Sequence, residues 1–285
     1  MTDIDQLEAF DEFVDGHDAL FHYTRLATAI EKILVEKRLR LSLLKDTNDP
    51  REYQFKLLGM TGWSLPPEAE ELCDRCHPVL DRITRFECRI LCFCTNDKAK
   101  ILQKSGGFLE DPIPYTRGWA KSRMWSQYGE KQHGVCLVFS RSLLQAEIEK
   151  YSASINWKRG AQVEYTIEER MPIHSLNIDG NRLVKEGVET YCASHVKQNI
   201  NDLFFTKHVD YRDESEFRIV VHDPTNAVEY MDISGTIRGI IAGDRIHEVY
   251  LPILEAFSRQ LHVEVRQVRW DRGKSHLLLL RRKET

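Results

Sequence analysis

The chain has 285 residues, of which 42% are hydrophobic, and it carries 40 Lys and Arg against 44 Asp and Glu, a formal net charge of −4. This length suits one large domain or two small ones. The net charge is too weak for the protein to bind a polyanion through its overall charge alone. The apolar runs fall short of the roughly 18 residues that a membrane helix needs, and the N-terminus is acidic, so we expect a cytoplasmic protein without membrane contact.

Charge is distributed unevenly along the chain. Residues 1–24 contain acidic side chains and no Lys or Arg, whereas residues 266–283 are rich in Arg and Lys. One interpretation is two solvated ends, or an acidic helix docked on a basic strand pair. The other is a basic rim for phosphate that an acidic arm masks. The pattern favours the first.

Apolar periodicity predicts the elements in chain order. An acidic helix spans 3–15, and a strand at 20–23 leads to Thr24, which caps the next helix. A half-buried strand at 39–42 precedes Pro50, which opens another helix. The remaining expected strands are 88–95, 135–139, 162–166, 217–222, 226–231, 236–242, 263–269 and 276–281. The remaining helices are 68–87, 119–131, 182–205 and 246–260, with a short helix capped by Ser140.

Strands early and late, with helices between them, indicate an α+β fold around a mixed, mainly antiparallel sheet. We expect one domain over 1–285, with an acidic N-terminal helix over 1–18 and mainly helical insertions at 60–87 and 140–206. Residues 96–118 show no periodicity and contain Gly106-Gly107. We expect this long segment to form a mobile cover over the functional site.

The seven cysteines are an odd number, which favours free thiols. Cys73-Asp74-Arg75-Cys76-His77 matches the c-type haem attachment motif and begins like a zinc site. It lacks the second ligand pair that zinc requires, and it lies in a predicted helix. We therefore expect no metal and no haem.

Four motifs follow one another along the chain: His22-Tyr23-Thr24, Asn48-Asp49-Pro50-Arg51-Glu52, Trp125-Ser126-Gln127-Tyr128 and Glu214-Ser215-Glu216-Phe217-Arg218. Together with Leu39-Arg40-Leu41-Ser42, His133-Gly134-Val135-Cys136 and the Lys207 and Tyr211 spacing, they resemble the bacterial domain-of-unknown-function family 2971. The opening segment is remotely similar to that of ADP-ribosyltransferases, including toxins that modify nucleic acids. This resemblance implies an ADP-ribosyltransferase-like split sheet with flanking helices, and NAD as the substrate.

By this resemblance, His22 would hold ribose hydroxyls, with Tyr23 and Thr24 beside it. Asn48 or Asp49 would bind the ribose or the amide. Adjacent strand residues point to opposite faces, so Tyr23 is better suited to the core than to stacking on the nicotinamide.

The third motif would face the nucleotide through Ser126 or Tyr128, with Tyr128 stacking on the nicotinamide ring and Arg123 meeting the diphosphate. Of the two glutamates in the last motif, Glu216 would polarise the ribose hydroxyl, and Glu214 would handle the acceptor.

Each motif also has a structural explanation. His22 can be a strand-end histidine bound to a carbonyl, and Asp49 can cap a helix with Glu52 in its first turn. Trp125 fits an aromatic core face, and Arg218 can pair with Glu216 on an exposed face. At strand spacing, Glu214, Glu216 and Arg218 share one face.

The motifs taken together predict an NAD-dependent ADP-ribosyltransferase-like enzyme, which the resemblance associates with bacterial toxins and phage-defence effectors. Its acceptor is RNA, DNA or protein, and an antitoxin or regulatory protein is the expected partner. Two alternatives stay open. One is a non-catalytic nucleic-acid- or partner-binding module that uses residues 98–123 and the C-terminal strands. The other is an NAD or nucleotide hydrolase without an acceptor.

Overall fold

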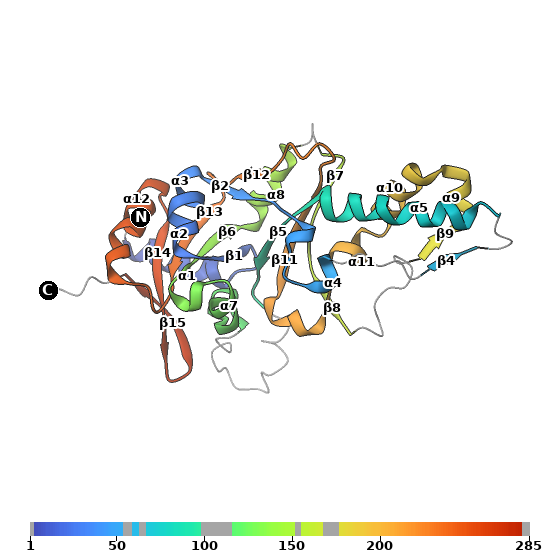
Figure 1. Cartoon of the computed structure of the whole chain (residues 1–285). Helices are drawn as coiled ribbons and strands as arrows, with labels where there is room; N and C mark the ends of the chain where they lie inside the picture. Colours follow the sequence, from blue (N-terminus) through green and yellow to red (C-terminus); the bar gives the residue numbers. More distant parts are fainter. Residues whose placement is uncertain are drawn as a thin grey trace.

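The computed structural model describes residues 3–53, 59–62, 67–97, 116–151, 155–167 and 177–280. A nine-stranded, mainly antiparallel sheet runs through the molecule (Figure 1), in the order β15-β14-β13-β6-β1-β5-β11-β7 with β3 beside β5. The fold is therefore mixed α+β, as expected. The sheet contains β1 (Ala19–Thr24), β3 (Ser42–Leu43), β5 (Cys88–Cys94), β6 (Val135–Ser140), β7 (Trp157–Gln162), β11 (Glu216–His222), β13 (Ile237–Ala242), β14 (Glu264–Asp271) and β15 (Lys274–Leu279).

The helices and the short strands surround this sheet. The α-helices are α1 (Asp3–Asp15), α2 (Leu26–Thr28), α3 (Leu34–Glu36), α4 (Pro50–Tyr53), α5 (Ala69–Asp81), α7 (Ser122–Gln127), α8 (Arg141–Glu149), α9 (Gly180–Glu186), α10 (Val188–Gln198), α11 (Ile200–Phe204) and α12 (Leu251–Leu261). Three two-stranded ladders join β2 (Arg38–Arg40) to β12 (Tyr230–Asp232), β4 (Gly59–Thr61) to β9 (Asn177–Asp179), and β8 (Glu164–Thr166) to β10 (Thr206–His208).

Several boundaries differ from the predicted ones. Thr24 does not cap a helix, because β1 runs through it and α2 begins after Arg25 without a side-chain cap. The helix expected over 182–205 is three helices. Gly187, with a φ of 78°, separates α9 from α10, and Asn199, which also has a non-helical backbone, separates α10 from α11. Pro252 lies in the first turn of α12, where its missing N–H costs nothing, rather than at a kink.

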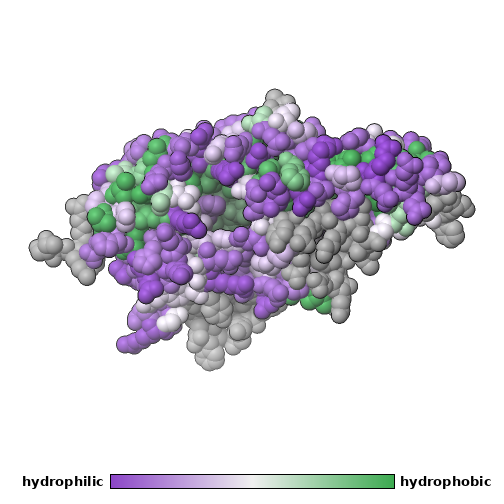
Figure 2. All heavy atoms as spheres, in the orientation of Figure 1, coloured by the Kyte–Doolittle hydropathy of each residue, from purple (hydrophilic) through white to green (hydrophobic). Residues whose placement is uncertain are grey.

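Two apolar clusters cover the two faces of the sheet. One contains Leu20 and Phe93, and the other contains Phe21, Tyr23 and Trp125. Every residue of β6 is buried, as expected for a strand with both faces covered. Figure 2 shows a largely polar face with apolar residues gathered at the end that carries α12.

A third apolar cluster joins the central strands β5 and β11 to a helical arm at one end of the molecule, where α5 packs against α9 and α10 (Figure 1). The insertion expected at 60–87 contains β4 and α5. The insertion expected at 140–206 includes β7, β8 and β9 as well as helices, so its strand content was underestimated. Among the described residues, no helix is long and apolar enough to cross a membrane.

The sheet opens between β1 and β5. These strands pair at one position, where Phe21 lies opposite Cys94. Continuing that antiparallel register would place Tyr23 opposite Cys92, but the strands diverge. The opening positions the candidate site, because it exposes the backbone and the side chains of two central strands to one cavity.

Candidate functional site

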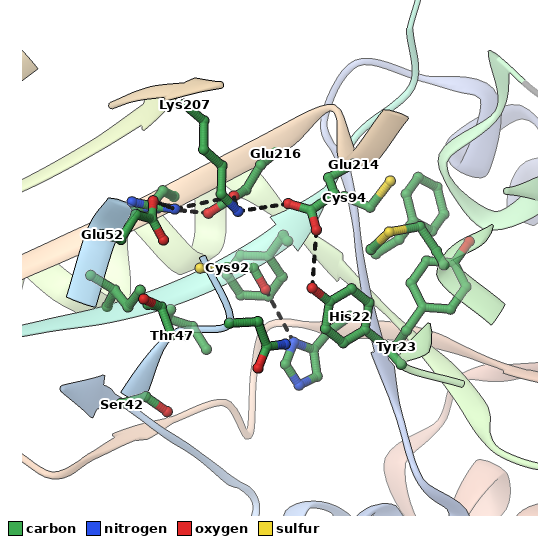
Figure 3. Close-up of a pocket in the computed structure, with 18 of the residues that line it drawn as sticks. His22, Tyr23, Ser42, Thr47, Glu52, Cys92, Cys94, Lys207, Glu214 and Glu216 are labelled. Carbon is green, nitrogen blue, oxygen red and sulfur yellow. Dashed lines mark hydrogen bonds and ion pairs between the residues drawn. The ribbon is translucent and has the colours of Figure 1, made fainter. Parts of the chain in front are cut away.

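A cavity of about 260 Å³ lies at the divergence of β1 and β5. It brings together six of the ten residues that the sequence motifs singled out, from segments far apart in the chain: His22, Tyr23, Asn48, Tyr128, Glu214 and Glu216. Lys207, Arg218, Glu52, Cys92, Arg40 and Asp46 also line it. Figure 3 shows Glu216, Lys207 and Glu214 joined by dashed bonds, with His22 beneath them.

His22 bridges the opening in the sheet. It is the one residue of β1 that is not buried, and its Nδ1 lies 3.2 Å from the carbonyl oxygen of Cys92 on β5. This carbonyl would have met a backbone N–H had the two strands stayed paired, so the imidazole replaces the missing partner. If Nδ1–H donates, Nε2 is left with a lone pair for a ligand hydroxyl. Burial lowers the pKa of His22, which keeps the ring neutral at pH 7.

Tyr23 belongs to the core, as its opposite orientation on the strand predicted. Its ring packs edge-on against Trp125, with the centroids 5.0 Å apart, and its hydroxyl donates to the carbonyl of Gly118 at 2.5 Å. Trp125 is fully buried in the same cluster. The structural explanation therefore accounts for both aromatic side chains, although Tyr23 also reaches the cavity wall.

A buried lysine joins the two motif glutamates. Lys207 of β10 donates from Nζ to Oε2 of Glu214 at 2.7 Å and to Oε2 of Glu216 at 3.1 Å. All three residues are buried. Although burial opposes its charge, the three carboxylates of Glu216, Glu52 and Glu214 raise the pKa of Lys207.

Arg218 holds the far side of Glu216. Its Nε lies 2.6 Å from Oε1, and its second terminal nitrogen lies 3.2 Å from Oε2. The same nitrogen is 2.6 Å from Oε1 of Glu52, with which it forms an ion pair. Burial acts to raise the pKa of Glu216, but the charges of Arg218 and Lys207 hold it at about 2. For Glu52, burial outweighs Arg218, and its pKa is raised.

Glu214 keeps more bonding capacity than Glu216. Its Oε1 accepts one hydrogen bond from the hydroxyl of Tyr128 at 3.0 Å, and its Oε2 accepts one from Lys207. Both oxygens of Glu216 are engaged by Arg218, and one of them also by Lys207. Burial and the charge of Glu214 raise the pKa of Tyr128, so this hydroxyl stays protonated.

A tight turn at Ser215, rather than strand spacing, turns both glutamates toward the cavity. Glu214 ends the 3₁₀ helix η9 (Val209–Glu214), and Ser215 has a φ of 43° before β11 begins. The turn is fixed by Thr95, which donates to the Ser215 carbonyl from its N–H and its hydroxyl, and by Lys121, whose Nζ lies 2.5 Å from the Ser215 hydroxyl. The prediction that Glu214, Glu216 and Arg218 share one strand face was therefore wrong for Glu214.

Four predicted site residues do not line this cavity. Thr24 is buried at the end of β1, and Asp49 is buried before α4. Ser126 and Arg123 are exposed, and Arg123 donates to the Asp210 carbonyl and pairs with Asp213. The expected mobile cover at 96–118 falls mostly on residues 98–115, which lie outside the described residues.

The cysteine motif lies in the helical arm, remote in sequence from these residues. Cys76 is buried next to Cys192, while Cys73 is partly exposed. All seven cysteines are free. In the described ranges we find no group of three His, Cys, Asp or Glu side chains arranged to hold a metal ion.

Sequence reasoning underestimated three residues. Lys207 was noted only for its spacing to Tyr211, yet it lines the cavity and bonds both motif glutamates, and Glu52 was assigned to a helix start. Tyr165 was missed, although its hydroxyl accepts the N–H of Glu216 at 2.9 Å. A usable signal existed for Lys207 alone, because a lysine seven residues before a glutamate motif lies on the segment that leads into the strand.

Residues 124–219 match the family described as protein of unknown function DUF2971. The matched segment contains Tyr128, Lys207, Glu214, Glu216 and Arg218, the charged wall of the cavity, whereas His22 lies outside it. No curated protein and no solved structure matches the chain, so these comparisons give no support to the similarity with ADP-ribosyltransferases.

Proposed function

We propose that the protein is an ADP-ribosyltransferase-like enzyme that cleaves the bond between nicotinamide and ribose in NAD. The observation that carries this proposal is the convergence of His22, Tyr128 and Glu214 on one cavity at the opening between β1 and β5. They supply a neutral imidazole, an aromatic hydroxyl and a carboxylate. These are the groups needed to hold a ribose hydroxyl and to stabilise the positive charge that develops as the bond breaks.

The charge of the cavity supports its use for the nicotinamide end of the dinucleotide. Its lining has three cationic and four acidic side chains, a formal net charge of −1. The nicotinamide ring of NAD is cationic, and cleavage moves positive charge onto the ribose, so an anionic wall favours both states. A cavity of about 260 Å³ also suits one end of the dinucleotide better than the whole molecule.

The geometry favours different roles for the two glutamates from those expected. Glu214 has one partner on each oxygen and shares a hydrogen bond with Tyr128. It is the carboxylate with room to accept a bond from the ribose. Glu216 is bound on both oxygens by Arg218 and also by Lys207, and we assign it the role of holding Lys207 in place.

The experiment that tests this proposal measures nicotinamide release from NAD, with RNA, DNA and protein supplied separately as acceptors. Glu214→Gln should lower kcat by about a hundredfold or more and change NAD affinity little, because the charge acts in the transition state. Glu31→Gln, on an exposed helix face, is the matched control.

Three outcomes separate the alternatives. Label from NAD that reaches an acceptor supports a transferase, and label that stays in free ADP-ribose supports a hydrolase. Folded wild-type protein that releases no nicotinamide with any acceptor contradicts the proposal. Loss of turnover in folded Glu216→Gln but not in Glu214→Gln would return the catalytic role to Glu216. The roles of toxin or phage-defence effector, and an antitoxin or regulatory partner, rest on the resemblance and belong to this proposal.

A further inference from the structure

A second cavity, of about 470 Å³, lies against the other side of the turn that carries the two glutamates. Ser215, between Glu214 and Glu216, lines it, and so does Thr95, which follows Cys94 of the first cavity. Tyr165 also lines the second cavity while its hydroxyl accepts the N–H of Glu216. The two cavities are therefore separated by one backbone turn.

The second cavity has the opposite charge. Arg141 and Arg212 are its cationic side chains and Asp97 its acidic one, which gives a formal net charge of +1 with His17 neutral. In the first cavity, Arg218 and Lys207 are bound by carboxylates. In the second, among the described residues, no carboxylate lies within ion-pair distance of Arg141 or Arg212.

Arg141 packs over an aromatic ring, and one of its donors has no partner among the described residues. Its guanidinium lies 4.7 Å from the centre of the Phe217 ring, and its Nε is buried without a hydrogen-bond partner in the described part of the chain. A buried guanidinium donor normally has an acceptor, and planar guanidinium groups match phosphate oxygens. Burial lowers the pKa of Arg141, and the negative charge of Asp18 offsets this effect only in part.

Two further side chains, Tyr165 and Arg212, offer hydrogen-bond donors to the second cavity, so the N-terminus of α8 is not needed as a donor. The Tyr165 hydroxyl accepts from Glu216, and no acceptor for its own proton is found among the described residues. Arg212, exposed at the rim, donates weakly to the Val209 carbonyl at 3.4 Å. The N-terminus of α8 is already satisfied, since Ser140 accepts from Leu143 and Asp18 from Ser142.

We propose that this second cavity binds a phosphate group through Arg141 and Arg212. Two sources share this chemistry: the backbone of a nucleic-acid strand, and the diphosphate of a dinucleotide. The inference stands on the second cavity alone and does not require that NAD is cleaved.

The test measures binding without turnover. A short fluorescent single-stranded RNA, inorganic pyrophosphate and NAD are titrated onto the full chain at several salt concentrations. Replacing both Arg141 and Arg212 with Gln should weaken the binding of the RNA or of the NAD, whichever carries the phosphate that the cavity recognises, by about tenfold or more. It should also reduce the salt dependence of RNA binding by about one counterion for each phosphate that is no longer bound. Arg259→Gln, at an exposed position of α12, removes one positive charge elsewhere, as Arg212→Gln does, and should leave the affinity for all three probes unchanged.

Comparing the RNA and NAD titrations identifies which molecule supplies the bound phosphate. Weaker RNA binding with unchanged NAD binding indicates a nucleic-acid strand, and the reverse indicates the dinucleotide. Unchanged affinity for all three probes in the folded double variant overturns the inference. Arg212→Gln alone, at an exposed position, guards against misfolding. Glu214→Gln should retain phosphate binding, which separates failure here from failure of the proposed reaction.

Discussion

Among single residues, His22 best illustrates how a local interruption of strand pairing places a polar side chain in a cavity. Because β1 and β5 separate, the Cys92 carbonyl loses its strand partner and accepts the imidazole instead. The sequence alone suggested both a ribose-binding role and a histidine tied to a carbonyl. The structure shows that the two are compatible, since one ring nitrogen meets the carbonyl and the other remains for a ligand.

The pKa of His22 gives a stability prediction. Burial lowers it below 6.5, so the unfolded chain takes up this proton more readily than the folded one. The stability contribution is therefore complete above about pH 6.5 and declines as the pH falls below that value. Urea unfolding from pH 7.5 to 5 should show this decline in the wild type. His22→Gln, which can still donate to Cys92, should lose less stability over the same range. Equal pH dependence in both proteins would contradict the assignment.

Glu216 should stabilise the fold strongly. Its replacement by Gln removes a buried charge that Arg218 and Lys207 share, and removing one partner of a buried ion pair typically costs about 3–5 kcal/mol. We expect a loss of this size in the free energy of unfolding, measured by urea titration, against almost none for Glu31→Gln. With a folded pKa of about 2, the contribution is present above about pH 4.5 and is lost as the pH falls toward 2. A loss below 1 kcal/mol would show that the cluster is not structural.

The individual residues of the site were only partly predictable. The spacing of Glu214, Glu216 and Arg218 indicated a shared polar face, and these side chains do meet. They meet because Ser215 adopts a positive φ, and nothing in a Glu-Ser-Glu sequence predicts that backbone conformation. Glu52 was interpreted through its own helix because its partner, Arg218, is remote in sequence. Local patterns cannot show such pairing.

At the scale of elements, the N-terminal helix docks on the sheet, which is one of the two forms of the interpretation that the charge pattern favoured. Phe10 and Val14 of α1 are buried, and Arg266 of β14 lies over the Phe10 ring at 5.2 Å and 4.0 Å from Asp11. Gly239 of β13 permits this docking. A Cβ atom there would lie 2.3 Å from the Phe10 ring.

Gly239→Ala should therefore destabilise the protein by about 1–3 kcal/mol, the usual cost of overpacking. Gly235→Ala is the matched control, because an added Cβ at Gly235 would meet nothing within 4 Å. Thermal unfolding of both variants tests this expectation. Adding Phe10→Leu to Gly239→Ala should restore part of the loss, since the smaller side chain makes room. No difference between the two glycine variants would show that α1 is not held at this point.

Strands were predicted better than helix boundaries. Apolar runs at Cys88–Cys94 and Val135–Ser140 are long enough to identify central strands without any knowledge of their neighbours. Thr24 failed as a cap because β1 is extended by its pairing with β6, in which Thr24 lies opposite Val135. Tertiary pairing overrode a local preference there.

For the whole molecule, the predicted mixed, mainly antiparallel sheet is confirmed, but its order was not predictable. Sequence periodicity identifies strands but does not give their order in the sheet. It could not show that β1 lies between β5 and β6, which determines where the cavity forms. The helical arm was expected as insertions. Its internal packing of α5 against α9 and α10 depends on contacts between residues that are far apart in the sequence.

The single backbone pair between Phe21 and Cys94 makes the central seam mechanically compliant. Each half of the sheet is stiffened by full ladders, such as β1 with β6 and β5 with β11, whereas the seam depends on one residue pair and the His22 bridge. Residues of both β1 and β5 line the first cavity, so a molecule bound there would contact both halves and would act as a removable cross-link. NAD or ADP-ribose should therefore slow the exchange of backbone amide hydrogens in residues 19–24 and 88–94 together. If the two halves of the sheet unfold separately without ligand, they should unfold in a single transition when it is bound. On this proposal, occupancy of the first cavity and the rigidity of the sheet should rise together.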